Sequence, residues 1–185
     1  PHERPVAGFV GVIDERLDTE LVGRLADELP DWDIQIVGPV VKIDPATLPQ
    51  APNIAYPGAK SYAELPQVMA GFDVAIMPFA INEATRSISP TKTLEYLAAG
   101  LPVVSTPVPD VVADFPGIVG IASDPVDFAE QCQEALACDR DELNKKVWPI
   151  LRRQHWDAIA ARMAALLRPA SVTAGALADT AEETA

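Results

Sequence analysis

The sequence predicts an α/β protein with a doubly wound parallel sheet of about six strands. The first observation is the alternation of short apolar segments with amphipathic helical segments along most of the chain. The second is that the apolar segments are nearly continuous, which is typical of strands buried on both faces of a parallel sheet. The third is composition, because 185 residues with 49% hydrophobic content suffice for one sizeable core.

Each strand is expected where an apolar run is bounded by turn residues. The six runs occupy residues 6–13, 33–39, 53–56, 72–79, 103–105 and 118–121. Because the run at 72–79 is the most continuous, we expect it near the centre of the sheet. The Pro-rich residues 40–52 are expected to form an irregular surface connection.

Helices are expected between these runs. Their ranges are 18–29, 64–70, 90–99, a short helix within 107–114, 124–136, 141–148 and 155–167. Asp18 and Asp124 are expected to cap two of them. Pro149 is expected to end the helix that begins at Asp141, because proline removes a hydrogen bond and clashes with the preceding turn.

The sequence predicts one domain over residues 1–168. Beyond Pro169 the chain contains Ala, Thr, Ser and acidic residues without aromatics. Such a composition buries too little apolar surface to offset the entropy of ordering, so we expect residues 169–185 to be a disordered tail.

The most informative segment begins at Ser89 and Pro90. Ser89 is a good N-cap, and Pro90 suits the first helical position because its fixed φ matches a helix. Gly100 and Pro102 are expected to end this helix before the strand at 103–105. Its buried face is predicted from apolar residues at spacings of three and four: Leu94, Leu97, Ala98 and Leu101.

The first turn of this helix has the features of an anion site. Lys92 lies where the helix dipole disfavours a cation by about 0.3–1 kcal/mol. Free N–H groups together with the hydroxyls of Ser89, Thr91 and Thr93 suit a phosphate. Glu95 follows about one turn later, where its carboxylate can accept hydrogen bonds from a ribose diol. Alternatively, Lys92 and Glu95 form an exposed ion pair worth about 0.2–0.5 kcal/mol.

Two other segments carry candidate ligand contacts. Arg16 lies in the loop after the first strand, at the edge where parallel sheets bind ligands, so it is a candidate phosphate partner. The alternative is a solvated loop arginine. Tyr56 can flank a base and Gly58 permits close approach of the backbone. The alternative is a turn glycine beside a core aromatic.

Composition excludes several functional classes. The formal net charge of −13 and the pI near 4.4 disfavour nucleic acid. Cys132 and Cys138 have no second Cys or His pair to complete a metal site, so we expect no metal, no cofactor and a reduced, cytoplasmic protein. No segment approaches the roughly 20 apolar residues of a membrane span, and the N-terminus is not a signal peptide. Peripheral contact with the inner face of a membrane remains compatible with the sequence.

Dinucleotide binding of the usual kind is also disfavoured. The first strand carries Gly8 and Gly11 but does not complete the G-x-G-x-x-G pattern. An NAD-dependent oxidoreductase domain is therefore the weakest hypothesis. No Walker-type loop is present either, and the residues suited to anions are concentrated between Asn82 and Glu95.

A family pattern is carried by residues 90–104, which read PTKTLEYLAAGLPVV. This segment resembles the donor-binding helix of retaining glycosyltransferases with the GT-B fold, of the glycosyl transferases group 1 type. Further matching segments occur in the order and spacing of that family's carboxyl-terminal domain, at 53–58, 64–66, 72–74 and 77–79. The resemblance covers about residues 6–168 and implies a Rossmann-like domain that is one half of a GT-B fold.

The resemblance implies a binding site for the nucleotide diphosphate-sugar donor. Glu95 would bind the ribose hydroxyls, and Lys92 with the backbone N–H groups near Thr91 would bind the phosphates. Residues 56–58 would border the base. Residues 89–95 look most like bacterial enzymes that build surface polysaccharides, often from UDP-sugars.

The sequence departs from the family pattern in two places. Many members carry two glutamates separated by seven residues, and Ser87 stands at the first of these positions. Asn82 or Glu83 would have to substitute for it. Members also carry a basic pair after the first strand, whereas Arg16 is the only basic residue in that loop.

The resemblance also implies a partner domain, because family members bind the acceptor and catalyse transfer between two Rossmann-like domains. We therefore expect this chain to bind nucleotide but to have little or no transferase activity without the amino-terminal domain. The catalytic residues stay unassigned. The alternative is a noncatalytic domain that binds nucleotide-sugars or another protein.

Overall fold

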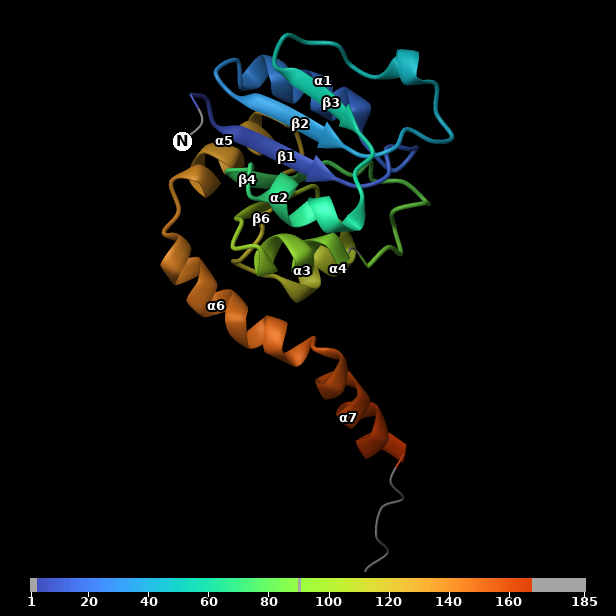
Figure 1. Cartoon of the computed structure of the whole chain (residues 1–185), viewed down its shortest axis with the longest axis vertical. Helices are drawn as coiled ribbons and strands as arrows, with labels where there is room; N and C mark the ends of the chain where they lie inside the picture. Colours follow the sequence, from blue (N-terminus) through green and yellow to red (C-terminus); the bar gives the residue numbers. More distant parts are fainter. Residues whose placement is uncertain (1–2, 90, 168–185) are drawn as a thin grey trace, which may run out of the picture. The chain divides into compact units, whose positions relative to one another are not determined.

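The computed structural model describes residues 3–89 and 91–167 (Figure 1). It divides into two compact units, Pro1–Leu151 and Arg152–Ala185. The second unit contains α7 (Trp156–Leu167), the helix expected at 155–167. The predicted disordered tail, 169–185, lies outside the described residues, so that expectation stays a prediction.

The first unit is built on a six-stranded parallel sheet in the order β3-β2-β1-β4-β5-β6. This confirms the predicted fold class and the central position of the strand expected at 72–79. Most strands are shorter than their apolar runs, because the runs extend into the loops. Their bounds are β1 (Val6–Val10), β2 (Asp33–Val37), β3 (Ile54–Gly58), β4 (Val74–Met77), β5 (Val103–Ser105) and β6 (Gly120–Ile121).

Strand order reverses between β1 and β4, which pair in parallel through Ala7 with Val74 and Gly8 with Ala75. After β1 the chain turns toward β2 on one side, whereas after β4 it turns toward β5 on the other. The loops that follow β1 and β4 therefore meet at the carboxyl edge of the sheet, where the strand order reverses. Ligands of open α/β sheets bind at such a switch point.

Helices cover both faces of the sheet, as a doubly wound fold requires. Alternate strand residues belong to different cores: Ala7 and Phe9 point to one, Val6 and Val10 to the other. The first core is covered by α1 (Thr19–Glu28) and α5 (Pro125–Leu136). The second is covered by α2 (Leu65–Met69), α3 (Thr91–Ala98), α4 (Pro109–Asp114) and α6 (Arg140–Arg153).

Local sequence explains several helix ends. The Asp18 carboxylate accepts a hydrogen bond from the Leu21 N–H at 2.9 Å. Asp124 accepts from the N–H groups of Val126 and Asp127. Both predicted caps are thus confirmed. Gly100 follows α3 with φ of +73°, the left-handed conformation that glycine adopts without steric cost.

Helix α6 differs from the prediction, because it continues through Pro149 to Arg153. An interior proline costs about 3 kcal/mol. Val147 is 1% exposed, and Ile150 and Leu151 pack against the same core. Ile150 and Leu151 lie beyond the proline and are partly buried, so their packing favours continuation of the helix past Pro149. The prediction that Pro149 ends the helix was wrong.

The buried face of α3 is also rotated from the predicted one. Thr93, Tyr96 and Leu97 are buried, whereas Leu94 is half-buried and Ala98 is exposed. The Tyr96 hydroxyl accepts a hydrogen bond from the Val10 N–H at 2.8 Å and donates to the Val10 carbonyl. Burial of this large ring turns Ala98 outward and ties α3 to the end of β1.

Candidate functional site

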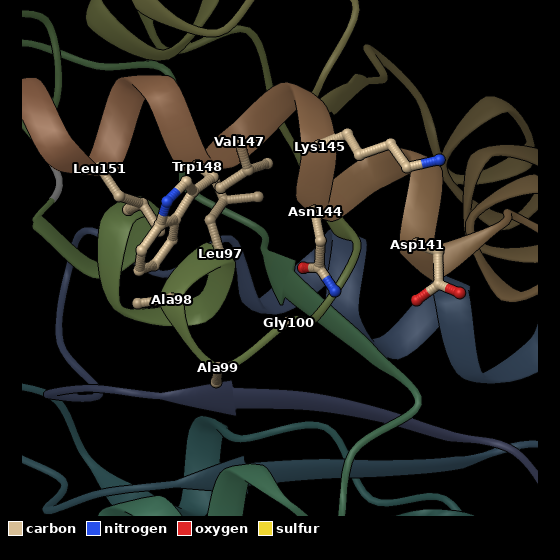
Figure 2. A pocket seen from close by; sticks show the side chains of 10 residues that line it. All are labelled: Leu97, Ala98, Ala99, Gly100, Asp141, Asn144, Lys145, Val147, Trp148 and Leu151. Atoms are coloured by element: carbon tan, nitrogen blue, oxygen red, sulfur yellow. The ribbon is translucent and has the colours of Figure 1, made fainter.

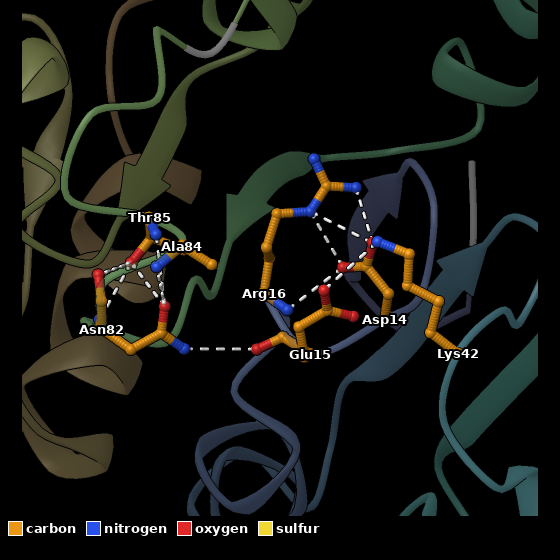
Figure 3. Close-up of polar contacts among 7 residues, drawn as sticks. All are labelled: Asp14, Glu15, Arg16, Lys42, Asn82, Ala84 and Thr85. Carbon is orange, nitrogen blue, oxygen red and sulfur yellow. Dashed lines mark hydrogen bonds and ion pairs between the residues drawn. The ribbon is translucent and has the colours of Figure 1, made fainter.

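The loops after β1 and β4 are joined by hydrogen bonds at the carboxyl edge of the sheet (Figure 3). The Ala80 N–H donates to the Arg16 carbonyl at 2.9 Å, and the Asn82 side-chain amide donates to the Glu15 carbonyl at 3.3 Å. The Asn82 side-chain oxygen also accepts from the Ala84 and Thr85 N–H groups. These contacts hold the two sides of the switch point together.

Arg16 is held in place by a buried carboxylate. The Asp14 side chain is 2% exposed and accepts hydrogen bonds from Arg16 Nη2 at 2.7 Å and from Nε at 2.9 and 3.1 Å. The hydrogen bond from Arg16 lowers the pKa of Asp14 below its ordinary value of 3.8. These bonds use Nε and Nη2 and leave Nη1 to contact an anion. Arg16 is therefore an oriented cation at this edge, 40% exposed, rather than a freely solvated side chain.

Lys42 is a second cation near this edge that sequence reasoning missed. It follows β2 in a left-handed backbone conformation, with φ of 64°. Its Nζ lies 3.3 Å from Glu15 Oε1, so it belongs to the same polar cluster (Figure 3). No sequence signal announces this position, because a non-glycine residue with positive φ is uncommon and depends on its surroundings.

The amino-terminal turn of α3 lies after the β4 loop. Thr91 begins the helix and is exposed, as is Ser89 before it, whereas Pro90 lies outside the described residues. The Thr93 hydroxyl is buried 3.5 Å from Met77 Sδ, so it faces the core instead of the predicted anion. The exposed hydroxyls at this turn are thus those of Ser89 and Thr91.

Lys92 and Glu95 form an ion pair, with Lys92 Nζ 2.7 Å from Glu95 Oε2. Their side chains are 28% and 35% exposed, so the pair is partly sheltered on the flank of α3. The structure therefore contains the Lys92–Glu95 ion pair that the sequence analysis gave as the alternative to an anion site. The same geometry places a cation and a hydrogen-bond acceptor side by side. A phosphate that binds Lys92 and a sugar hydroxyl that binds Glu95 would each replace one partner of the ion pair.

Tyr56 is engaged with the core. Its hydroxyl donates to the Pro49 carbonyl at 2.9 Å, its ring packs against the core under α1, and burial raises its pKa to about 12. Gly58 has φ of +77°, and nothing lies within 4 Å of the position a Cβ would take. Tyr56 thus packs as a core aromatic beside a turn glycine, which was the alternative to a base contact. A base contact by residues 56–58 stays a prediction.

An apolar cavity of about 420 Å³ lies between α2 and α3. Tyr62, the first residue of the 3-10 turn Tyr62–Glu64 that leads into α2, is 85% exposed at this cavity. Glu95 contributes the charged side chain of its α3 wall. The remaining lining residues are Leu65, Pro66, Met69, Ala70, Ala98 and Ala99. Sequence reasoning missed Tyr62, although an aromatic residue next to the matched 64–66 segment was a usable signal.

A separate cavity of about 700 Å³ lies between the carboxyl-terminal turn of α3 and α6 (Figure 2). Trp148 lies against Leu97 and Ala98 at one end, and Asn144 points toward Gly100 (Figure 2). Because α3 runs antiparallel to the strands, this turn lies away from the carboxyl edge that carries Arg16. The cavity is therefore not part of the polar cluster at the switch point.

Three further observations concern the described part of the chain. No group of three His, Cys, Asp or Glu side chains there could hold a metal ion. No helix there is long and apolar enough to cross a membrane. Cys132 and Cys138 are free, and burial raises the pKa of the Cys132 thiol.

Comparison with known proteins assigns the family. Residues 4–138 match the family model of the glycosyl transferases group 1, which is well over half of the chain. The chain belongs to the glycosyl transferases group 1. The earlier resemblance is thereby confirmed at the level of family and fold.

This glycosyl transferase group 1 chain has relatives about twice its length. It is 32% identical over 161 residues to TuaH of Bacillus subtilis (strain 168), named as a teichuronic acid biosynthesis glycosyltransferase. The match covers 83% of this chain but 41% of TuaH. The chain thus spans less than half of this relative.

Solved structures share the fold. Sucrose-phosphate synthase from Thermosynechococcus elongatus matches with a TM-score of 0.65 and 19% identity, over 90% of this chain and 45% of its own. Anabaena HepE, solved in complex with UDP and glucose, matches with a TM-score of 0.61 and 15% identity, over 87% of this chain and 48% of its own. The described fold therefore corresponds to one half of a GT-B glycosyltransferase.

Proposed function

We propose that this chain is the donor-binding half of a glycosyltransferase that takes a sugar from a nucleotide diphosphate-sugar, with a UDP-sugar favoured. The observation that carries the proposal is the Lys92–Glu95 pair on the first turns of α3, at the switch-point edge that also holds Arg16. Two relatives support the finer statement: HepE was solved with UDP and glucose, and TuaH is named for teichuronic acid synthesis. We accordingly assign the transfer to surface polysaccharide or glycan synthesis and leave the acceptor itself unassigned.

The proposed site binds the diphosphate and the ribose of the donor through different residues. The diphosphate binds at the amino-terminal turn of α3, where the Thr91 N–H, the helix dipole and Lys92 favour negative charge. Arg16 contributes its outward Nη1 from the opposite side of the switch point. Glu95, released from Lys92, accepts hydrogen bonds from the ribose hydroxyls. Ser89, whose side chain is exposed, precedes this turn, and Pro90 lies outside the described residues.

These groups also suit the chemical step that the family performs. When the glycosidic bond to the donor breaks, negative charge develops on the leaving diphosphate. Oriented cations and N–H groups stabilise that charge more than they stabilise the intact donor. Lys92 and Arg16 are the cations placed for this role, and retention of anomeric configuration follows from the family resemblance.

The acceptor site and the remaining catalytic groups are assigned to an amino-terminal domain of the same protein. On this proposal the present chain binds donor but transfers sugar slowly or not at all by itself. The full protein works in the cytoplasm, with peripheral contact at the inner face of the membrane where polysaccharide precursors are assembled.

Calorimetric titration of the chain with UDP, GDP and ADP tests the proposal. We expect saturable binding of UDP. Lys92→Ala should weaken it roughly 10-fold or more, because a charged hydrogen bond contributes about 1.5–3 kcal/mol. The matched control is Lys146→Ala, which removes an exposed lysine from α6 and should leave UDP affinity unchanged. Equal UDP affinity in wild type and Lys92→Ala would contradict the proposed site.

A noncatalytic nucleotide-sugar-binding or interaction domain is the second candidate, and one observation favours it. Ser87 stands at the first glutamate position. Asn82 is occupied by loop hydrogen bonds, and Glu83 is 93% exposed and paired with Arg86. Turnover by the full-length protein, abolished by a Lys92→Ala, Glu95→Ala double substitution, would exclude this candidate.

A further inference from the structure

We propose that the ring of Tyr62 stacks on the nucleobase of the bound donor, in the cavity between α2 and α3. This inference rests on the proposed function, because it takes Glu95 to be the ribose contact. It assigns the base to an aromatic side chain outside the 56–58 segment. It also gives the cavity of about 420 Å³ a defined occupant.

The direction of the nucleotide follows from its covalent structure. The phosphates are attached at the 5′ carbon of the ribose, and the base is attached at the 1′ carbon on the other side of the ring. With the phosphates at the Thr91 turn and the ribose hydroxyls at Glu95, the base can extend beyond Glu95 on the side away from that turn. The apolar cavity lies there, because Glu95 and Ala98 share one of its walls.

The cavity suits a flat, largely apolar ring. Its volume falls within the roughly 300–1,000 Å³ typical of small-molecule sites. Leu65, Pro66 and Met69 supply apolar contacts on the α2 side, and Ala98 leaves room on the α3 side because its side chain is a single methyl group. A base entering from Glu95 would therefore meet carbon surface on both walls.

Tyr62 is the aromatic residue that can cover such a base. Its side chain is 85% exposed, an unusual position for a large ring beside an apolar surface. The turn that carries it is ordered, because Ser61 donates to Glu64 Oε2 through its N–H at 2.9 Å and through Oγ at 2.6 Å. Tyr56, in contrast, places its ring in the core and its hydroxyl on Pro49.

Stacking accepts any base, since every base has a π face. Tyr62 should therefore contribute to the affinity for UDP and GDP alike, and other contacts should choose between them. Pyrophosphate lacks both ribose and base, so its binding should not depend on Tyr62. This difference separates the base contact from the phosphate contact.

The test is calorimetric titration of the whole chain with UDP and with pyrophosphate. Tyr62→Ala should weaken UDP binding by about 5- to 150-fold, the loss typical of one base–aromatic stack. Tyr62→Phe keeps the ring and should bind UDP like the wild type. Pyrophosphate affinity should be the same in all three proteins. In NMR spectra, the uracil H5 and H6 signals should shift upfield on binding to wild type and Tyr62→Phe, and not on binding to Tyr62→Ala.

The outcomes separate the two proposals. If Tyr62→Ala binds UDP like the wild type while Lys92→Ala does not, the stacking proposal is overturned and the donor site stands. If Tyr62→Phe loses as much affinity as Tyr62→Ala, the hydroxyl makes the contact and stacking is likewise rejected. If the wild type binds no UDP, or Lys92→Ala and Glu95→Ala bind it normally, the donor site fails and the Tyr62 contact fails with it.

Discussion

In the Asp14–Arg16 pair, a buried carboxylate orients a partly exposed guanidinium. Asp14 is almost fully buried, and its carboxylate orients the Arg16 guanidinium at the switch-point edge. A buried carboxylate without its partner is costly, so the two residues stabilise the fold only as a pair. The same pairing fixes the orientation of the Arg16 guanidinium, which the proposed function takes as a phosphate contact.

Arg16→Ala should destabilise the chain by about 1–3 kcal/mol at pH 7. This is less than for a fully buried pair, because Arg16 is 40% exposed and solvent screens its charge. The pKa of Asp14 in the folded protein is lowered from 3.8, so the pair stabilises the fold at pH values above about 4. That contribution disappears as pH falls through the lowered pKa.

Urea unfolding at pH 7, 5 and 3 measures this effect. The difference in unfolding free energy between wild type and Arg16→Ala should be largest at pH 7 and smallest at pH 3. A difference that stays constant over this range would show that Arg16 acts through packing alone and not through the Asp14 charge.

At the scale of elements, the position of α3 depends on one buried hydroxyl. Tyr96 joins the middle of α3 to the backbone of Val10 at the end of β1. Both elements border the switch point, so this contact places the Lys92 turn relative to the loop that carries Arg16. Burial raises the pKa of Tyr96, which keeps its hydroxyl protonated and able to donate.

Tyr96→Phe should lower the free energy of unfolding by about 1–3 kcal/mol, because it leaves the buried Val10 N–H without this acceptor. The matched control is Tyr62→Phe, an exposed position where the change should stay within about 0.5 kcal/mol. Urea unfolding of both variants measures the difference. Equal stability of Tyr96→Phe and wild type would mean that the hydroxyl does not hold α3 to β1.

The sequence predicted those features of the helices and strands that depend on neighbouring residues in the chain. Apolar runs and capping residues such as Asp18 and Asp124 act locally, and they located most strands and helices correctly. Burial of Tyr96 and continuation of α6 through Pro149 depend on packing between elements distant in the chain. Periodicity does not report such packing, so both features were mispredicted.

At the scale of the whole molecule, the alternation of strands and helices was sufficient to predict the sheet and its class. The helix-start pattern and the family resemblance both singled out Lys92 and Glu95, and the structure shows them as an ion pair, the alternative considered from the sequence. Lys42 was not foreseen, because its place beside Glu15 depends on tertiary structure, and Tyr62 was overlooked although it lies next to the matched 64–66 segment. The candidate site is thus partly readable from the sequence and is completed only by tertiary structure.

The central claim is that nucleotide binds at the switch-point edge, around α3 and the loop after β1. Backbone amide NMR spectra of the ¹⁵N-labelled chain, recorded during titration with UDP, test it directly. We expect the largest shifts at Thr91, Lys92 and Arg16, with smaller shifts near Tyr62. Shifts concentrated instead at Asn144 and Trp148, around the separate cavity beside α6, would contradict the account.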